Sequence, residues 1–169
     1  MASSSLAFAS LYSNLKSGAP PGKPGGDNTE IGTATPLKNA VESAHIQPDE
    51  IQYVNAHATS TPVGDVLESA AMEKLFGEKA TSGKLLISST KSMTGHLLGG
   101  AGGLEAGIAI MAMLDQIVPP TMNLDEQDPE CRLSYVPNTP RPLHIDIALS
   151  NSFGFGGTNG SLIFRRWQE

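Results

Sequence analysis

The chain has 169 residues, of which 39% are hydrophobic and 17% are charged, a balance that excludes an acidic disordered tail and a charge-rich coiled coil. Its formal net charge of −6 argues against non-specific binding to nucleic acid and against a polybasic membrane-binding surface. The single cysteine excludes an intramolecular disulfide and a cysteine-rich zinc site. The longest apolar run, residues 106–114, is much shorter than the roughly 20 residues of a transmembrane helix, so we expect no membrane span.

Residues 1–34 differ in composition from the rest of the chain. They are rich in Ser, Gly and Pro, and Asp27 is their first acidic residue. Such a start is typical of an organelle transit peptide, although arginine is absent; a disordered or mis-assigned N-terminus is the alternative. We therefore expect an N-terminal segment over residues 1–34 and a folded domain over residues 35–169. A transit peptide would direct the protein to a plastid or mitochondrion, and otherwise we expect it in the cytoplasm.

The first half of the expected domain predicts helix, strand and helix. Thr35 and Pro36 are typical of a helix start, and this helix runs to about residue 44. Residues 51–54 predict a short buried strand. A second helix begins near residue 61, has apolar residues at helical spacing and stops at Gly77.

The second half continues the alternation and ends in strands. Residues 85–87 predict a buried strand and residues 97–114 a long apolar helix. Residues 123–142 are rich in proline and polar side chains and predict an ordered surface loop. Two final strands over 145–149 and 161–164 are joined by a glycine-rich turn. This order predicts an α/β fold with a mixed sheet and layered helices.

Two of the four histidines fall at strand-to-helix turns. His57 follows the strand over residues 51–54, and His96 follows the next strand and opens the long helix. Sites in open α/β sheets form at the carboxyl ends of strands, so the two imidazoles could share a pocket. Two structural histidines are the alternative. His45 and His144 have the pattern of ordinary surface residues.

Metal and nucleotide sites find little support in the sequence. His57 and His96 lack carboxylates at ligand spacing, so we expect no metal site. The glycines over residues 99–107 fit neither the dinucleotide fingerprint nor a Walker loop, and favour close helix packing. Lys91 and Glu105 are charges among small and apolar residues, which suggests an ion pair; two solvated helix ends are the alternative.

Three motifs resemble those of the β-ketoacyl-acyl carrier protein synthases, the condensing enzymes of fatty-acid synthesis. Residues 55–62 (NAHATSTP) resemble the first histidine motif of that family, and residues 88–99 (SSTKSMTGHLLG) its lysine and second-histidine motif. Residues 151–159 (NSFGFGGTN) resemble its C-terminal glycine-rich turn. The likeness covers about residues 36–165 and implies the C-terminal half of a thiolase-like fold, incomplete relative to the full fold of two halves.

The resemblance also implies a reaction and the residues that perform it. The reaction is a decarboxylating Claisen condensation, in which malonyl carrier protein elongates an acyl chain held on a cysteine. By resemblance, His57 and His96 bind the malonyl thioester carbonyl, and Lys91, with Glu105 as its ion partner, orients the His96 region. Further positions that carry over are Thr59 and Thr61, which contact the pantetheine arm, and Phe155, which gates the nucleophile and contributes a backbone N–H to the oxyanion hole.

The family's nucleophilic cysteine lies in the other half of the enzyme and is not found here. Cys131 matches a non-catalytic position, so we expect this chain alone to be inactive. Acyl and malonyl carrier proteins and the N-terminal half of the synthase are the expected partners, and the phosphopantetheine arm arrives on the carrier, so no resident cofactor is expected. Family members are dimers, but we do not expect this half to self-associate. A non-catalytic thiolase-like fragment, serving as a binding or structural module or arising from a truncated gene, is the alternative; thiolases and polyketide-type enzymes fit the motifs less well.

Overall fold

A computed structural model describes residues 30–154 and 157–167 of the chain. The interpretation of the first residues as a transit peptide therefore falls largely on residues 1–29, outside the described part. Phe155 also lies outside it.

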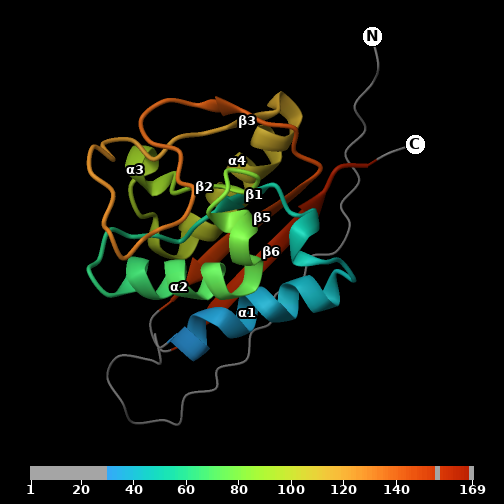
Figure 1. The fold of residues 1–169 in the computed structure, drawn as a ribbon, viewed down its shortest axis with the longest axis horizontal. Helices are drawn as coiled ribbons and strands as arrows, with labels where there is room; N and C mark the ends of the chain where they lie inside the picture. Colours follow the sequence, from blue (N-terminus) through green and yellow to red (C-terminus); the bar gives the residue numbers. More distant parts are fainter. Residues whose placement is uncertain (1–29, 155–156, 168–169) are drawn as a thin grey trace.

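A four-stranded sheet forms the centre of the molecule (Figure 1). Its strands are β1 (Tyr53–Asn55), β2 (Leu86–Ser88), β5 (Ile147–Phe153) and β6 (Asn159–Arg165), in the order β2-β1-β5-β6. β1 runs parallel to both β2 and β5, whereas β5 and β6 form an antiparallel pair. The predicted α/β fold with a mixed sheet is confirmed.

Helices cover both faces of this sheet. α1 (Glu30–Ser43) and α2 (Gly64–Phe76) lie on one face, and α4 (Ala101–Asp115) packs against the other. The short helix α3 (Lys91–Thr94) and the 3-10 turn η3 (Leu98–Gly100) lead from β2 into α4. The remaining elements are the 3-10 turns η1 (Pro48–Glu50) and η2 (Gly77–Ala80) and a two-stranded sheet of β3 (Ile117–Val118) and β4 (Arg141–Pro142).

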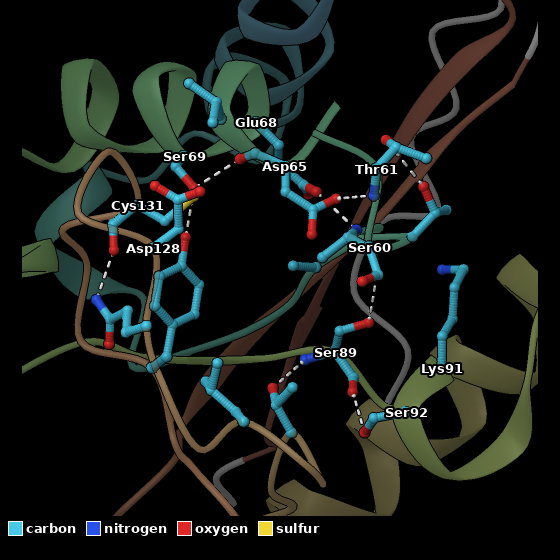
Figure 2. Close-up of a pocket in the computed structure, with 18 of the residues that line it drawn as sticks. Ser60, Thr61, Asp65, Glu68, Ser69, Ser89, Lys91, Ser92, Asp128 and Cys131 are labelled. Carbon is cyan, nitrogen blue, oxygen red and sulfur yellow. Dashed lines mark hydrogen bonds between the residues drawn. The ribbon is translucent and has the colours of Figure 1, made fainter. Parts of the chain in front are cut away.

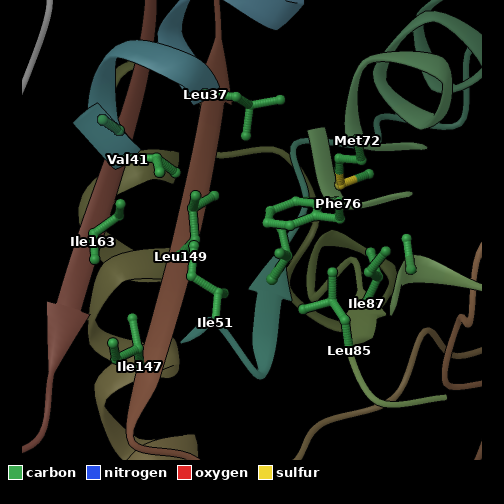
Figure 3. Packing of buried hydrophobic residues seen from close by; sticks show 14 of the residues in the cluster. Leu37, Val41, Ile51, Met72, Phe76, Leu85, Ile87, Ile147, Leu149 and Ile163 are labelled. Carbon is green, nitrogen blue, oxygen red and sulfur yellow. The ribbon is translucent and has the colours of Figure 1, made fainter. Parts of the chain in front are cut away.

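Alternation along the strands divides the core into two clusters, because successive side chains of a strand point to opposite faces. Val54, Ile87 and Leu149 face α1 and α2, where they meet the buried apolar side chains that Figure 3 shows. Tyr53 and Leu86 face α4. The short apolar runs therefore read as strands buried on both sides, which is why their sequence shows no polar alternation.

The helices differ from their predicted bounds at three places. α2 begins at Gly64 instead of near residue 61. α1 begins at Glu30 and holds Pro36 in its interior, because burial of Leu37 and Val41 against the sheet outweighs the backbone hydrogen bond that a proline lacks. The long helix begins at Ala101 instead of residue 97, after η3. The predicted stop at Gly77 is confirmed, and its φ of 55° explains the choice of glycine.

The segment over residues 123–142 is more than a surface loop. Leu133 and Val136 are buried, and the Val136 N–H donates to the Ile87 carbonyl at 3.0 Å. The Ile87 N–H in turn donates to the Ser134 carbonyl at 3.1 Å. The segment thus covers the open edge of β2, which its prolines and polar residues conceal in the sequence.

One helical segment, Leu98–Asp115, is long and apolar enough to cross a membrane by length and composition, although the sequence predicted no span. A helix that packs on a sheet passes the same test. Glu105, the fifth residue of α4, is only 1% exposed and lies within the protein core. We therefore interpret α4 as a layer of this fold.

Truncation of a core side chain should reveal this packing. We expect Leu149→Ala to lower the free energy of unfolding by about 2–5 kcal/mol, because Leu149 is 0% exposed between the sheet and the helices. Met111→Ala, at a side chain that is 53% exposed, should change it by less than about 0.5 kcal/mol. Urea unfolding of the two variants measures both; equal losses would contradict the assigned core.

Candidate active site

Three parallel strands end at the same edge of the sheet, and the candidate site lies there. Asn55 at the end of β1 pairs with Ser88 of β2 and with Ser150 of β5. His57 follows β1 by two residues, Lys91 follows β2 by three, and Phe153 ends β5. The parallel register therefore brings together residues that are far apart in the sequence.

The structure places the His57 and His96 imidazoles next to each other. Their ring centroids are 5.5 Å apart, and the planes are nearly perpendicular at 85°. The Phe153 ring packs against His57 at 5.7 Å. His57 is half-buried and His96 is exposed, so the pair opens to solvent on the His96 side.

His57 is held as a neutral imidazole. Burial, followed by the positive charge of Lys91 and the neighbouring His96, lowers its pKa from 6.5 to about 4. Its Nδ1 atom is buried and has no hydrogen-bond partner within the described part of the chain. A neutral ring at physiological pH can donate or accept one hydrogen bond at Nε2.

The proton of neutral His96 is fixed by the backbone. The Leu98 N–H donates to Nδ1 of His96 at 3.0 Å, so a neutral His96 carries its proton on Nε2. The turn into α4 makes this contact, since Gly95 has a φ of 71° and Leu98 one of 51°. His96 is thereby prepared to donate a hydrogen bond from Nε2.

Lys91 and Glu105 form the predicted ion pair. Lys91 Nζ donates to Glu105 Oε1, and the two side chains are 5% and 2% exposed. Burial raises the pKa of Glu105, while the hydrogen bond and charge of Lys91 act in the opposite direction. A buried ion pair thus lies close enough to His57 for the charge of Lys91 to act on it, and the alternative of two solvated helix ends is wrong.

Glu68 is a site residue that the sequence analysis missed. Its carboxylate, 2% exposed in α2, accepts the backbone N–H groups of His57 at 2.9 Å and Ala58 at 2.8 Å. It also accepts Nδ2 of Asn151 at 3.0 Å. A charge on the same helical face as Ala71 and Met72 was the available signal, because a buried carboxylate requires such partners.

A cavity of about 610 Å³ adjoins the loop that follows His57 (Figure 2). Thr59 and Thr61 line it, together with Lys91 and Asp65, whereas neither imidazole is among its lining residues. The hydroxyls of Thr59 and Thr61 are 3.4 Å apart. The cavity therefore offers polar groups beside the histidine pair.

The close approach of Thr61 explains a glycine in this loop. A Cβ on Gly64 would lie 2.4 Å from Oγ1 of Thr61, so a larger residue would displace that side chain. The Thr61 N–H also donates to Asp65 Oδ1 at 3.4 Å. Burial raises the pKa of Asp65, against the backbone hydrogen bonds of the loop.

Cys131 lies at the far end of the same cavity. Figure 2 shows it beside Ser69 and Asp128, across the opening from Lys91. Burial raises the pKa of its thiol, and the negative charges of Asp128 and Glu130 raise it further. A raised pKa lowers the fraction of reactive thiolate, so the environment is unsuited to a nucleophile.

The other candidate residues are placed as follows. His45 and His144 are exposed, as predicted, and His144 contacts Asp146 at 3.0 Å. Within residues 30–154 and 157–167, no three His, Cys, Asp or Glu side chains gather as a metal site would require. The predicted role of Phe155 concerns a residue outside the described part.

Comparison with known proteins places the chain in a family. Residues 22–125 match the model of the β-ketoacyl synthase, C-terminal domain. The chain therefore belongs to the β-ketoacyl synthases, a family of condensing acyltransferases, and the resemblance inferred from its motifs is confirmed.

The similar proteins are longer than this chain. A 3-oxoacyl-[acyl-carrier-protein] synthase 2 from Coxiella burnetii is 52% identical over 135 residues, which are 80% of this chain and 32% of that protein. The crystal structure of a β-ketoacyl synthase from Burkholderia phymatum has a TM-score of 0.78 at 42% identity and covers 93% of this chain and 36% of its own. A solved complex, AntDE:AntF, is described as a type II PKS acyl-carrier protein with its ketosynthase; it has a TM-score of 0.79 at 33% identity over 85% of this chain and 35% of that one. The chain thus spans about a third of the length of the curated relatives that it matches.

Replacement of the buried carboxylate should destabilise the fold. Glu68→Gln puts an amide N–H₂ where a carboxylate oxygen accepts backbone N–H groups, so we expect the free energy of unfolding to fall by about 1–3 kcal/mol. The control is Glu73→Gln on the same helix. The Glu73 carboxylate forms a surface ion pair with Arg132, so this substitution should change the free energy of unfolding by less than about 0.5 kcal/mol. Thermal or urea unfolding compares them, and equal effects would exclude an anchoring role for Glu68.

Titration should separate His57 from an ordinary histidine. We expect the Cε1–H signal of His57 in NMR spectra, assigned with His57→Gln, to titrate near pH 4 instead of 6.5. Because the folded state binds this proton more weakly than the unfolded state, the contribution of His57 to stability is lost as the pH falls from about 6.5 to about 4. A midpoint near 6.5 would show that His57 is neither buried nor close to Lys91.

Proposed function

We propose that this chain supplies the histidine and lysine side of the active site of a β-ketoacyl-acyl carrier protein synthase that elongates fatty acyl chains. The observation that carries the proposal is the pair of imidazoles 5.5 Å apart at the ends of parallel strands. His57 is neutral, and the backbone hydrogen bond to Nδ1 leaves the proton of neutral His96 on Nε2. Two such donors suit a developing negative charge on one oxygen.

In the proposed reaction, the bond between the malonyl carboxylate and its α-carbon breaks and carbon dioxide leaves. The electron pair moves into an enolate, whose oxygen is the former thioester carbonyl. Hydrogen bonds from Nε2 of His57 and His96 would stabilise this enolate more than the neutral thioester, which lowers the barrier. The buried Lys91, paired with Glu105, would help to keep His57 neutral for this role.

The second step of the proposal forms the new carbon–carbon bond. The α-carbon attacks an acyl thioester on a cysteine, and the thiolate of that cysteine leaves. Phe155 would contribute a backbone N–H to the oxyanion hole of this step. Cys131 is not the proposed nucleophile, because burial raises its pKa and it lies across the cavity from Lys91.

The cavity beside His57 would receive the phosphopantetheine arm. Thr59 and Thr61 present hydroxyls there that can bond to the amides of the arm. The arm arrives on acyl or malonyl carrier protein, so the chain needs no cofactor of its own. The similar AntDE:AntF structure, described as a ketosynthase in complex with an acyl-carrier protein, supports this type of partner.

The exposed side of α4 would pack against the rest of the synthase, which supplies the nucleophile. Leu104 and Met111 are 38% and 53% exposed on this helix, and Leu98 just before it is 76% exposed. Only 28% of the apolar segment Leu98–Asp115 is buried. The 135 matched residues are only 32% of the Coxiella burnetii synthase, so about two thirds of such a protein remains to cover this face.

A chimera tests the proposal. The 135 matching residues of the Coxiella burnetii synthase are replaced by those of this chain. We expect the chimera to release carbon dioxide from malonyl carrier protein and to elongate an acyl chain. His57→Ala in the chimera should slow condensation by about 10²–10³-fold, because one of two donors to the enolate is lost.

Two controls accompany this assay. His144→Ala removes an exposed histidine and should leave the rate of the chimera unchanged. The chain alone should not condense the two substrates. If the chain alone formed an acyl-enzyme, the proposal that its nucleophile comes from another part of the synthase would be refuted. If the chimera were inactive while the parent synthase was active, the result would favour a non-catalytic module.

A further inference from the structure

Ser89 lies at the junction of the loops that carry the candidate site. It follows β2 directly and is 6% exposed. Its hydroxyl donates to the Ala58 carbonyl at 2.8 Å, and its N–H donates to Oγ1 of Thr121 at 2.9 Å. Its own carbonyl accepts the hydroxyl of Ser92 at 2.8 Å. Ser89 is thus joined to three segments, through its hydroxyl to Ala58 and through its backbone to Thr121 and Ser92.

The bond to Ala58 occurs where the sheet no longer holds the chain. The parallel pairing of β1 and β2 continues as far as the Ala56 N–H, which donates to the Ser88 carbonyl at 2.9 Å. Beyond this point β1 continues into the loop that carries His57, and β2 into the turn that leads to Lys91 at the start of α3. Side chains must therefore fix how far these loops separate.

The residue after His57 is held from both sides. The Ala58 N–H donates to Glu68 of α2, and the Ala58 carbonyl accepts the hydroxyl of Ser89. The bond to Glu68 connects the His57 loop to α2. The bond to Ser89 connects the same loop to the turn that leads to Lys91 and His96. The two contacts therefore have different consequences for the histidine pair.

Ser89 itself has a fixed position. Thr121 holds its N–H from the loop after β3, and Ser92 in α3 holds its carbonyl. The Met122 N–H donates to the Ser92 hydroxyl at 2.9 Å, which closes the connection between that loop and α3. The Ser89 hydroxyl is consequently a rigid donor.

We propose that Ser89 is a positioning residue, whose hydroxyl sets the separation of the His57 and His96 imidazoles by holding the Ala58 carbonyl. Ser89 touches neither imidazole in this role, so it acts on the reaction through His57. The inference rests on the proposed function for its catalytic consequence, but its geometric part can be measured independently.

The geometric test uses the full chain with 13C-labelled histidine. We expect the NOE between the rings of His57 and His96 to be present in the unchanged chain and to weaken in Ser89→Ala, while the other backbone signals keep their dispersion. Ser89→Thr keeps the hydroxyl and should restore the NOE. Ser82→Ala, which removes an exposed hydroxyl bonded to the Lys79 carbonyl, is the matched control and should leave it unchanged.

The kinetic test uses the chimera described above. We expect Ser89→Ala to lower kcat for malonyl decarboxylation by about 10–100-fold, because the imidazoles are displaced. Ser89→Thr should recover most of kcat. A merely structural serine would lower the amount of folded enzyme and not kcat per folded enzyme.

The outcomes separate the two proposals. An NOE and a kcat that are both unaffected by Ser89→Ala would overturn the positioning role. An inactive chimera would refute the proposed function, whereas the NOE comparison would still decide whether Ser89 sets the ring separation. If Ser89→Ala alters the NOE and Ser89→Thr does not restore it, the hydroxyl is not the cause and the proposal is wrong.

Discussion

The parallel pairing of β1 with β2 and β5 is the constraint on which the rest of the structure depends. Because parallel strands end at one edge, this pairing delivers His57, Lys91 and Phe153 to the same place. The connections between the parallel strands are helices, and these bury both faces of the sheet. Core and site therefore have a common origin in the strand register.

Buried charge gives the site its chemical character. Glu68 and the pair of Lys91 and Glu105 are nearly inaccessible to water. Glu68 accepts three hydrogen bonds, whereas Glu105 is held by Lys91 at Oε1 and its buried Oε2 has no hydrogen-bond partner within the described residues. Removing such groups from water is costly, so their positions are strongly specified by the contacts that compensate them. The positive charge of Lys91 in turn contributes to the lowered pKa of His57, so the buried ion pair influences the protonation state of a candidate catalytic residue.

The two sides of α4 have opposite environments. One side packs on the sheet through Ala109, Ala112 and Met113, and the other exposes Leu104 and Met111. A helix that is apolar on all sides is typical of a buried layer. In the proposed function, this exposed side would contact the rest of a synthase of the relatives' length.

The sequence by itself determined the class of fold, the two histidine turns and the family, and it suggested the ion pair of Lys91 with Glu105 that the structure then showed. These are local or motif-level properties: apolar runs bounded by turns predict strands, and rare residue strings identify relatives. Only the tertiary structure decided the start of α1, the buried part of residues 123–142 and the roles of Glu68 and Ser89 in holding the Ala58 peptide. Hydrogen bonds to backbone atoms require that two segments far apart in the sequence lie close together in space. A local sequence pattern does not encode that separation.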